Sequence, residues 1–526
     1  MGPKSGRLVA EQPHKWPKTG FLKRADCFAD SLLVRGRVGC KVSAGRGGEW
    51  VRRLEIGGDW AAVVRTLADV GRIFGLSLLL PTLVAIFDRE LGLALVFGGT
   101  SVMVLLAAIW GRRLGRRDVD NWHATLALAL AWPLLSLISS LPFVVGGVSS
   151  LDALYEGVSA WTDTGLTMIQ DPSTLPASLA TFRILIQWFS GLGIAMFMLL
   201  LRASSPRVAR SLFEAEGRSE DFATNTWQIG RTVVRIYALY TLAGAVALWL
   251  TGLPPMSALA HAVTSLSTGG FSTNSVGVGL YGALPSIVAM ALMVAGGISF
   301  TAHHSLLQGK FREFFANPEI QALFAIIGGA TVLVLLGFGA AGEDVVASAV
   351  PGVFYVITSI TTCGAGTTLA LSAVPESVRF ILLLLMVSGA VYGSTTGALK
   401  LWRLIIVGKI VGREVHRPFL PAAAVVPIRI GGTLISESLA AAVTGYVILY
   451  VVMGLAGGLV FMIAGYQPID ALFTVFSAQG NVGLNAMPEA LYFGMPPGLK
   501  WLLILHMLVG RVEILPLLSM LQGLRE

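Results

Sequence analysis

The chain has 526 residues, of which 54% are hydrophobic and only 13% are charged, and its formal net charge is +8. Because a soluble protein carries about 25% charged residues, this composition excludes a soluble globular protein and indicates a membrane protein. The three cysteines, Cys27, Cys40 and Cys363, lack the spacing of a disulfide framework or a zinc site.

The first 70 residues precede the first long apolar run and contain no apolar core of the length that a cleavable signal requires. Residues 1–55 are rich in Lys and Arg, and residues 50–70 mix charges with aliphatic side chains, which favours an interfacial helix. We therefore expect residues 1–70 to form a basic cytoplasmic tail that ends in an interfacial segment.

Apolar runs long enough to cross a bilayer as helices, roughly 20 residues each, follow along the rest of the chain. They predict ten spans, near residues 72–88, 91–110, 124–147, 181–201, 231–252, 284–306, 320–341, 378–408, 438–465 and 497–522. Basic side chains such as Arg112, Arg113, Lys409 and Arg413 gather in alternate loops. By the positive-inside rule, these loops and both termini are cytoplasmic. The net charge is thus a topology signal and does not indicate a nucleic-acid partner.

Four short segments of the chain can be aligned with one another. The eight later spans form four pairs, and each segment precedes the second span of one pair. They read SAWTDTGL (159–166), TSLSTGGF (264–271), TSITTCGA (358–365) and SAQGNVGL (477–484). Their aligned glycines are 105, 94 and 119 residues apart in the chain, so one structural unit occurs four times.

A glycine after small polar residues lets the backbone turn its carbonyls toward a common axis. Four such turns around one axis form a ring of carbonyl oxygens that replaces the water around a dehydrated cation. The alternative is that these glycines serve helix packing, as others among the 61 glycines do. The predicted filter residues are Asp163, Thr164, Gly165, Thr268, Gly269, Gly270, Thr362, Cys363, Gly364, Asn481, Val482 and Gly483.

A short helix is predicted before each of these glycines. Asp152, Ser257 and Asp470 each lie 13 residues before their glycine, and Asp and Ser are preferred N-caps. In the third copy Pro351 has this position, which suits a first helical turn. Because about ten helical residues reach only half of a bilayer, we expect these segments to enter the membrane and turn back.

The span predicted at 378–408 contains a stripe of small residues, Gly389, Gly393 and Gly397. Tight helix packing is one interpretation of such a stripe. The inserted Ser394 and Thr395 favour a break in the helix instead.

Three charged residues lie in apolar surroundings. Asp163 is either a solvated residue at an outer mouth or a group that acts on permeating ions. One interpretation of Lys400 and Arg511 is an anchor that snorkels to the cytoplasmic face. For Arg511, a structural pair with a carboxylate is also open, since Glu513 follows it.

Further motifs follow in the second span of each unit. They read RILIQWFSGLGI (183–194), GGISFTAH (296–303), GAVYGSTTGALK (389–400) and GRVEI (510–514). Together with the four glycine segments, they resemble the Trk/Ktr/HKT superfamily of potassium transporters over about residues 70–525. The extra N-terminal pair of spans is similar to the TrkH branch of that superfamily.

The resemblance implies a K+ filter, because all four filter positions are glycine. Asp163 and Cys363 depart from the threonine that is usual there, which bears on the preference for K+ over Na+. The resemblance also implies an intramembrane gate beneath the filter, built from Gly389, Gly393, Ser394, Thr395, Gly397 and Lys400 with Arg511 facing it. A homodimer and a separate cytosolic nucleotide-binding subunit of the TrkA/KtrA type are implied as partners.

We predict an all-α polytopic membrane protein with four pseudo-fourfold span–pore-helix–span repeats and an extra N-terminal two-helix hairpin. The predicted boundaries are 1–70 for the tail and interfacial segment, 71–118 for the hairpin, and 119–215, 216–315, 316–430 and 431–526 for the repeats.

The predicted function is K+ uptake across a bacterial inner membrane, with K+ as the transported ion, no organic cofactor, contact with membrane lipid and no enzymatic activity. One alternative is a secondary symporter of a solute with Na+ or H+, which inverted repeats would indicate. Another is a Na+-permeable cation transporter of the same fold.

Overall fold

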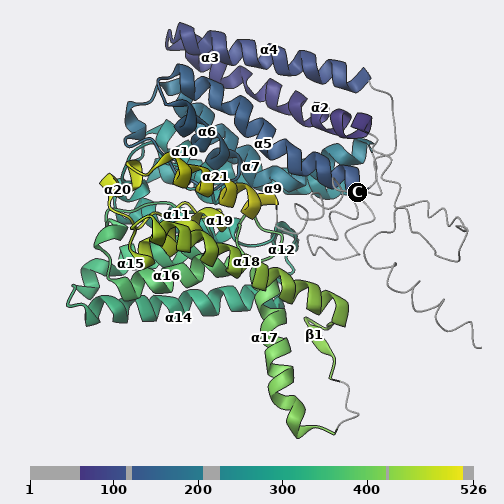
Figure 1. Cartoon of the computed structure of the whole chain (residues 1–526), viewed down its shortest axis with the longest axis vertical. Helices are drawn as coiled ribbons and strands as arrows, with labels where there is room; N and C mark the ends of the chain where they lie inside the picture. Colours follow the sequence, from purple (N-terminus) through teal and green to yellow (C-terminus); the bar gives the residue numbers. More distant parts are fainter. Residues whose placement is uncertain (1–59, 114–120, 205–225, 422–425, 513–526) are drawn as a thin grey trace, which may run out of the picture. The chain divides into compact units, whose positions relative to one another are not determined.

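The computed structural model describes residues 60–113, 121–204, 226–421 and 426–512 (Figure 1). These residues are helical apart from loops and one antiparallel hairpin, β1 (Ile428–Ile430) and β2 (Thr433–Ile435). Residues 1–59, most of the predicted tail, lie outside the described residues.

Helices occupy all of the predicted spans. They are α2 (Trp60–Ser77) with α3 (Leu79–Phe87), α4 (Leu91–Arg113), α5 (Asn121–Val145), α7 (Ala177–Ser204), α9 (Thr226–Leu250), α11 (Ala283–Gly296) with α12 (Phe300–Leu307), α14 (Pro318–Ala340), α16 (Glu376–Ser388) with α17 (Leu401–His416), α18 (Glu437–Ile463) and α21 (Pro497–Val512). Among the described helices, five are long and apolar enough to cross a bilayer alone, at Val63–Phe87, Leu91–Arg113, Gly230–Leu250, Pro318–Ala340 and Glu437–Ile463. The prediction of an all-α polytopic membrane protein is confirmed.

The first span begins earlier than predicted. Helix α2 begins at Trp60, and the apolar span that it shares with α3 covers Val63–Phe87. Helix α2 thus overlaps the end of the predicted interfacial segment, residues 50–70, whose place at the membrane surface stays a prediction. The charge of Asp69 is tolerated in this span because it pairs with Arg112 of α4, at 3.2 Å.

This N-terminal hairpin packs on the first repeat through aromatic side chains. Phe74 of α2 lies edge-on to Trp161, with ring centroids 5.4 Å apart. Phe97 of α4 makes a similar contact with Phe182 of α7, at 5.0 Å. Such edge-to-face pairs stabilise by about 1 kcal/mol beyond the area that they bury.

The span predicted at 284–306 is bent, since α11 and α12 meet at 104°. The sequence predicted one span here and did not predict this bend. Gly297 ends α11, and Ser299 begins α12 by accepting a hydrogen bond from the Ala302 amide. Backbone groups freed by such a break need other partners in a membrane. The carbonyls of Gly296 and Gly297 accept hydrogen bonds from a loop of the third repeat, described below.

Four short helices precede the filter glycines: α6 (Ser150–Trp161), α10 (Pro255–Ser267), α15 (Val345–Ile360) and α19 (Pro468–Gln479). Each ends three or four residues before its glycine. The predicted re-entrant helices therefore exist, and their C-termini point their partial negative charge toward the glycine segments.

The starts of these helices differ from the prediction. The N-caps are Ser149, Pro254 and Gln467, so Asp152, Ser257 and Asp470 lie inside the first turn rather than at the cap. In α10 and α19 a proline at the first helical position sets the start, because its ring fixes a helical φ.

In the third copy Pro351 lies inside α15 and not in its first turn. Helix α15 begins six residues earlier because Asp344 caps it, accepting hydrogen bonds from the amides of Val346 and Ala347 at 2.9 and 3.3 Å.

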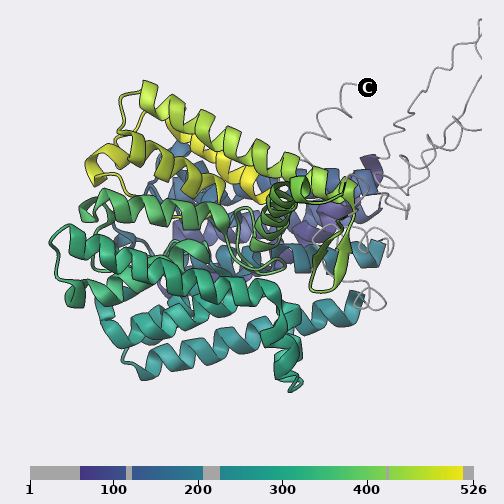
Figure 2. The same cartoon turned by 90° about the horizontal axis from the view of Figure 1, so that it is seen from below.

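The chain is not helical between α16 and α17, as the insertion of Ser394 and Thr395 predicts. After this break, α17 runs across the direction of α14 instead of alongside it (Figure 1). Figure 2 shows α17 nearly end-on, with the β1–β2 hairpin beside it. Arg413 of α17 forms an ion pair with Glu437 at the start of α18.

The cap of α15 can be tested by substitution. We expect Asp344→Ala to lower the free energy of unfolding by about 1 kcal/mol, because two amides lose their acceptor. Thermal unfolding of the purified protein in detergent measures this loss. Asp344→Asn keeps an acceptor oxygen and should retain most of the stability, so equal losses in the two variants would contradict the cap.

Candidate functional site

The four filter glycines form a closed ring. A Cβ atom added to any of them would meet a carbonyl oxygen of the following repeat, in the cyclic order one, two, three, four, one. The distances from that Cβ would be 2.3 Å from Gly165 to the Gly269 oxygen, 2.1 Å from Gly270 to Cys363, 1.8 Å from Gly364 to Val482 and 2.1 Å from Gly483 to Thr164. No side chain fits at these distances, so each repeat requires glycine where it abuts its neighbour.

All four segments share one backbone conformation. The residue two positions before each glycine has a left-handed φ, between +51° and +62°, at Asp163, Thr268, Thr362 and Asn481. The glycines themselves have φ values of +72° to +100°. Non-glycine residues seldom adopt this region. Its recurrence at four positions with different side chains indicates a common requirement, which is to turn the intervening carbonyls toward the axis.

The first and fourth repeats are joined by side chains as well as by backbone. The Asn481 amide donates to Thr164 Oγ1 at 3.0 Å and to the Met507 carbonyl of α21 at 2.8 Å. These bonds close the ring at the junction between the two ends of the repeat array.

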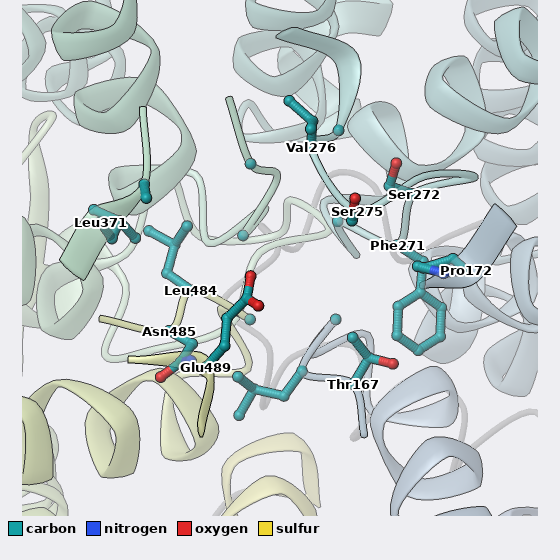
Figure 3. Close-up of a pocket in the computed structure, with 18 of the residues that line it drawn as sticks. Thr167, Pro172, Phe271, Ser272, Ser275, Val276, Leu371, Leu484, Asn485 and Glu489 are labelled. Carbon is teal, nitrogen blue, oxygen red and sulfur yellow. The ribbon is translucent and has the colours of Figure 1, made fainter. Parts of the chain in front are cut away.

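A cavity of about 370 Å³ lies on one side of the ring (Figure 3). All four filter glycines line it, together with the loop that follows each of them. Glu489 extends into it from helix α20 (Glu489–Phe493). Nearby, hydrogen bonds from Ser173 lower the pKa of Asp171, which keeps that carboxylate ionised. The cavity thus presents negative charge to a cation that approaches the ring.

A buried ion pair holds the first filter segment. Arg183 of α7 and Glu156 of α6 are 2% and 0% exposed, and their side chains approach to 3.1 Å. Glu156 also accepts hydrogen bonds from Thr167 and from the Met168 amide, just after the filter. The Arg183 guanidinium lies 4.0 Å from the centre of the Phe271 ring of the second repeat. This pair therefore joins two repeats around the filter.

Gln187, one turn further along α7, holds the second filter segment. Its side-chain amide donates to the Gly269 carbonyl and accepts from the Phe271 amide, the latter at 3.1 Å. The sequence placed Arg183 and Gln187 in a motif but did not indicate these roles. The signal available was a charge and an amide four residues apart, on one face of an apolar helix.

Asp163 lies behind the ring and not at the outer mouth. Its side chain is 2% exposed, and neither carboxylate oxygen has a hydrogen-bond partner in the described part of the chain. Oδ1 lies against the backbone of Gly269, where a Cβ atom would come within 2.2 Å of it. The interpretation of Asp163 as a solvated residue is therefore wrong.

Cys363 is likewise buried, and its thiol faces the Thr264 carbonyl at 3.6 Å. Its own carbonyl oxygen is the one that excludes a side chain at Gly270. Cys363 thus contributes backbone to the ring.

The non-helical segment 389–400 of the third repeat contacts the ring on the side away from the cavity. Thr395 Oγ1 lies 3.0 Å from Thr268 Oγ1 and 3.1 Å from the Gly296 carbonyl. The Gly397 amide donates to Thr362 Oγ1 at 2.9 Å. A Cβ atom at Gly397 would lie 2.1 Å from the Gly480 carbonyl oxygen. The segment, called the gate loop below, therefore touches three of the four repeats.

The remaining predicted gate residues shape this loop. Gly389 and Gly393 have φ values of +66° and +78°, which side chains disfavour. Ser394 Oγ donates to the Val391 carbonyl at 2.6 Å. The Lys400 ammonium turns back to the loop and donates to the carbonyl and the hydroxyl of Thr396.

Arg511 contacts the first repeat. Its guanidinium donates to the carbonyl and the hydroxyl of Ser190, the latter at 3.1 Å, and lies 5.6 Å from the centre of the Trp132 ring. Ser190 in turn donates to the Trp161 carbonyl at the end of α6. Glu513, the nearby carboxylate in sequence, lies outside the described residues.

Comparison with known proteins gives one consistent result. The family model TrkH, described as a cation transport protein, matches residues 118–522. An uncharacterized cation transporter of Methanocaldococcus jannaschii is 29% identical over 88% of this chain and 95% of its own length. The Trk system potassium uptake protein TrkH of Salmonella typhimurium is 28% identical over 87% of this chain and 97% of its own. The crystal structure of the potassium transporter TrkH from Vibrio parahaemolyticus superposes with a TM-score of 0.77 at 25% identity, covering 88% of this chain and 99% of that one.

Because neighbouring filter segments are in direct contact, the effect of a side chain at a filter glycine can be predicted. In Gly364→Ser the new Cβ would lie 1.8 Å from the Val482 oxygen, so that carbonyl must move. We expect discrimination between K+ and Na+ to fall by roughly tenfold, which corresponds to about 1.4 kcal/mol of lost ion coordination. The inhibition of Rb+ uptake by competing Na+ measures this discrimination.

Gly329→Ser in α14 is a matched control, because a Cβ atom there meets nothing within 4 Å. Discrimination that survives in Gly364→Ser, or that falls equally in both variants, would contradict the filter assignment.

Proposed function

The chain belongs to the TrkH family of cation transport proteins, and on this premise we propose that it takes up K+ across the bacterial inner membrane. The family consists of membrane transporters and not of enzymes. The observation that carries the proposal is the closed ring in which Gly165, Gly270, Gly364 and Gly483 each abut a backbone carbonyl oxygen of the next repeat.

K+ first enters the cavity of about 370 Å³, where Glu489 attracts cations. It then sheds water and binds carbonyls of residues 163–165, 268–270, 362–364 and 481–483. The C-termini of α6, α10, α15 and α19 add partial negative charge around this path. The gate loop lies directly beneath, with Thr395 and Gly397 against the ring, and closes the way to the cytosol.

Two observations support K+ as the ion. All four ring positions are glycine, and relatives such as that of Salmonella typhimurium are named potassium uptake proteins. The unpartnered carboxylate of Asp163 behind the ring favours one competing candidate, a Na+-permeable transporter of the same fold. When it is ionised, this carboxylate raises the affinity of the site for small cations that a carbonyl ring alone disfavours.

The proposed assembly follows the Trk systems. We place the basic loops and both termini in the cytosol, and keep the repeat boundaries at 119–215, 216–315, 316–430 and 431–526. A second copy of the chain and a cytosolic nucleotide-binding subunit of the TrkA type are the proposed partners. The exposed Lys409 of α17 and Arg417, the residue that follows α17, offer that subunit a basic surface that leads into the gate loop.

Rubidium uptake tests the transported ion directly. We expect proteoliposomes that contain the purified chain to take up Rb+, K+ to compete in the same concentration range, and Na+ to compete at least roughly tenfold less well. The measurement is repeated with and without H+ and Na+ gradients. Transport of an organic solute without Rb+ flux would show the alternative symporter; equal competition by Na+ would show the Na+-permeable one.

Shortening the gate loop tests its role. We expect deletion of residues 391–397 to raise Rb+ flux severalfold and to reduce the response to a regulatory subunit, because the segment beneath the ring is removed. Fluxes are measured in proteoliposomes with equal amounts of reconstituted protein. Unchanged flux would count against the gate assignment.

A further inference from the structure

The backbone of the gate loop is also bound by a carboxylate from another helix. The Tyr392 amide of the loop donates to Glu319 Oε2 at 2.7 Å. Glu319 lies in the first turn of α14, the first span of the third repeat. Glu319 therefore holds the loop from the side opposite to the filter.

The Tyr392 side chain extends this attachment to two further helices. Its ring lies 5.6 Å from the ring of Trp402, at 41°, and the Arg403 guanidinium lies 5.6 Å from its centre. Both residues belong to the first turn of α17. Arg403 also lies 4.2 Å from the centre of the Tyr446 ring of α18. Tyr392 is thus held between α14 on one side and α17 with α18 on the other.

An acid in the first turn of a helix has an ordinary explanation, which is its favourable interaction with the helix dipole. In α14, however, Asn317 already caps the helix by accepting from the Glu319 amide at 2.9 Å. The Glu319 carboxylate itself reaches away from its own helix to a loop 73 residues further along the chain. Lys400, which ends the loop, is a positive group that acts on the same carboxylate.

We propose that Glu319 is a positioning residue that keeps the gate loop closed by binding the Tyr392 amide. This inference rests on the proposed function, since it assumes that the loop is the gate. Opening separates Tyr392 from Glu319 and from Trp402 and Arg403. Because these two residues begin α17, a displacement of α17 acts on the loop at the point where Glu319 holds it.

Three substitutions at one position separate this role from a helix-dipole role. Glu319→Asp keeps the negative charge in the first turn of α14 but is one methylene too short to reach the Tyr392 amide. Glu319→Gln keeps the reach and an acceptor oxygen but removes the charge. Glu319→Ala removes both.

Rb+ flux into proteoliposomes, without a regulatory subunit, is the measurement. We expect Glu319→Ala and Glu319→Asp to raise the basal flux by about tenfold, the factor that corresponds to 1.4 kcal/mol. Glu319→Gln should remain much closer to the unmodified protein, and competition by Na+ should be unchanged in all three because the filter is untouched. Glu376→Ala is the matched control, since Glu376 is a first-turn acid of α16 whose side chain is 80% exposed.

The opposite order, in which the Asp variant behaves like the unmodified protein and the Gln variant like the Ala variant, would assign Glu319 to the helix dipole and overturn the proposal. Equal flux in all variants would overturn it too. If deletion of 391–397 raises flux and Glu319→Ala does not, the proposed function stands and the positioning role fails. If the unmodified chain carries no Rb+ at all, the proposed function itself fails.

Discussion

The structure depends on the direct contact between the backbone of each repeat and the backbone of the next at the four filter glycines. A single methyl group at Gly364 would fall 1.8 Å from a carbonyl oxygen, well inside any van der Waals distance. The contact is cyclic, so no repeat can shift without moving two neighbours. The re-entrant helices, the buried ion pair of Arg183 with Glu156 and the clamp by Gln187 all hold this ring in register. The backbone carbonyls of such a ring are groups that replace the water around a dehydrated ion.

The two faces of the ring are held by interactions of different strength. On the cavity side, a charged pair is buried in low dielectric, and breaking such a pair by removing one partner costs about 3–5 kcal/mol. On the gate-loop side, the contacts of Thr395 and Gly397 are neutral hydrogen bonds, each with a net stabilisation of about 1 kcal/mol. Release of these two contacts therefore costs less than breaking the buried pair that holds the ring. The ring and the loop can therefore differ in stiffness although they are in direct contact.

Much of this arrangement could be predicted from the sequence, because repetition makes weak signals strong. Four aligned glycines and ten apolar runs were sufficient for the fold class and for the ring. The bend between α11 and α12 could not be predicted, because its freed carbonyls are satisfied by residues about 100 positions later in the chain. The start of α15 was missed because Asp344, and not Pro351, determines it. The burial of Asp163 and the bond from Tyr392 to Glu319 depend on which helices become neighbours, and no local pattern records that.

The bend at Gly296 and Gly297 has one further consequence. Their carbonyls are satisfied by amides and a hydroxyl of the gate loop, at Val391 and Thr395. If the loop leaves, these acceptors face the interior of a membrane protein without partners, which costs several kcal/mol for each group. Water is the available substitute. On the proposal that the loop is the gate, opening is therefore coupled to the entry of water at these two carbonyls, and dehydrating conditions favour the closed state.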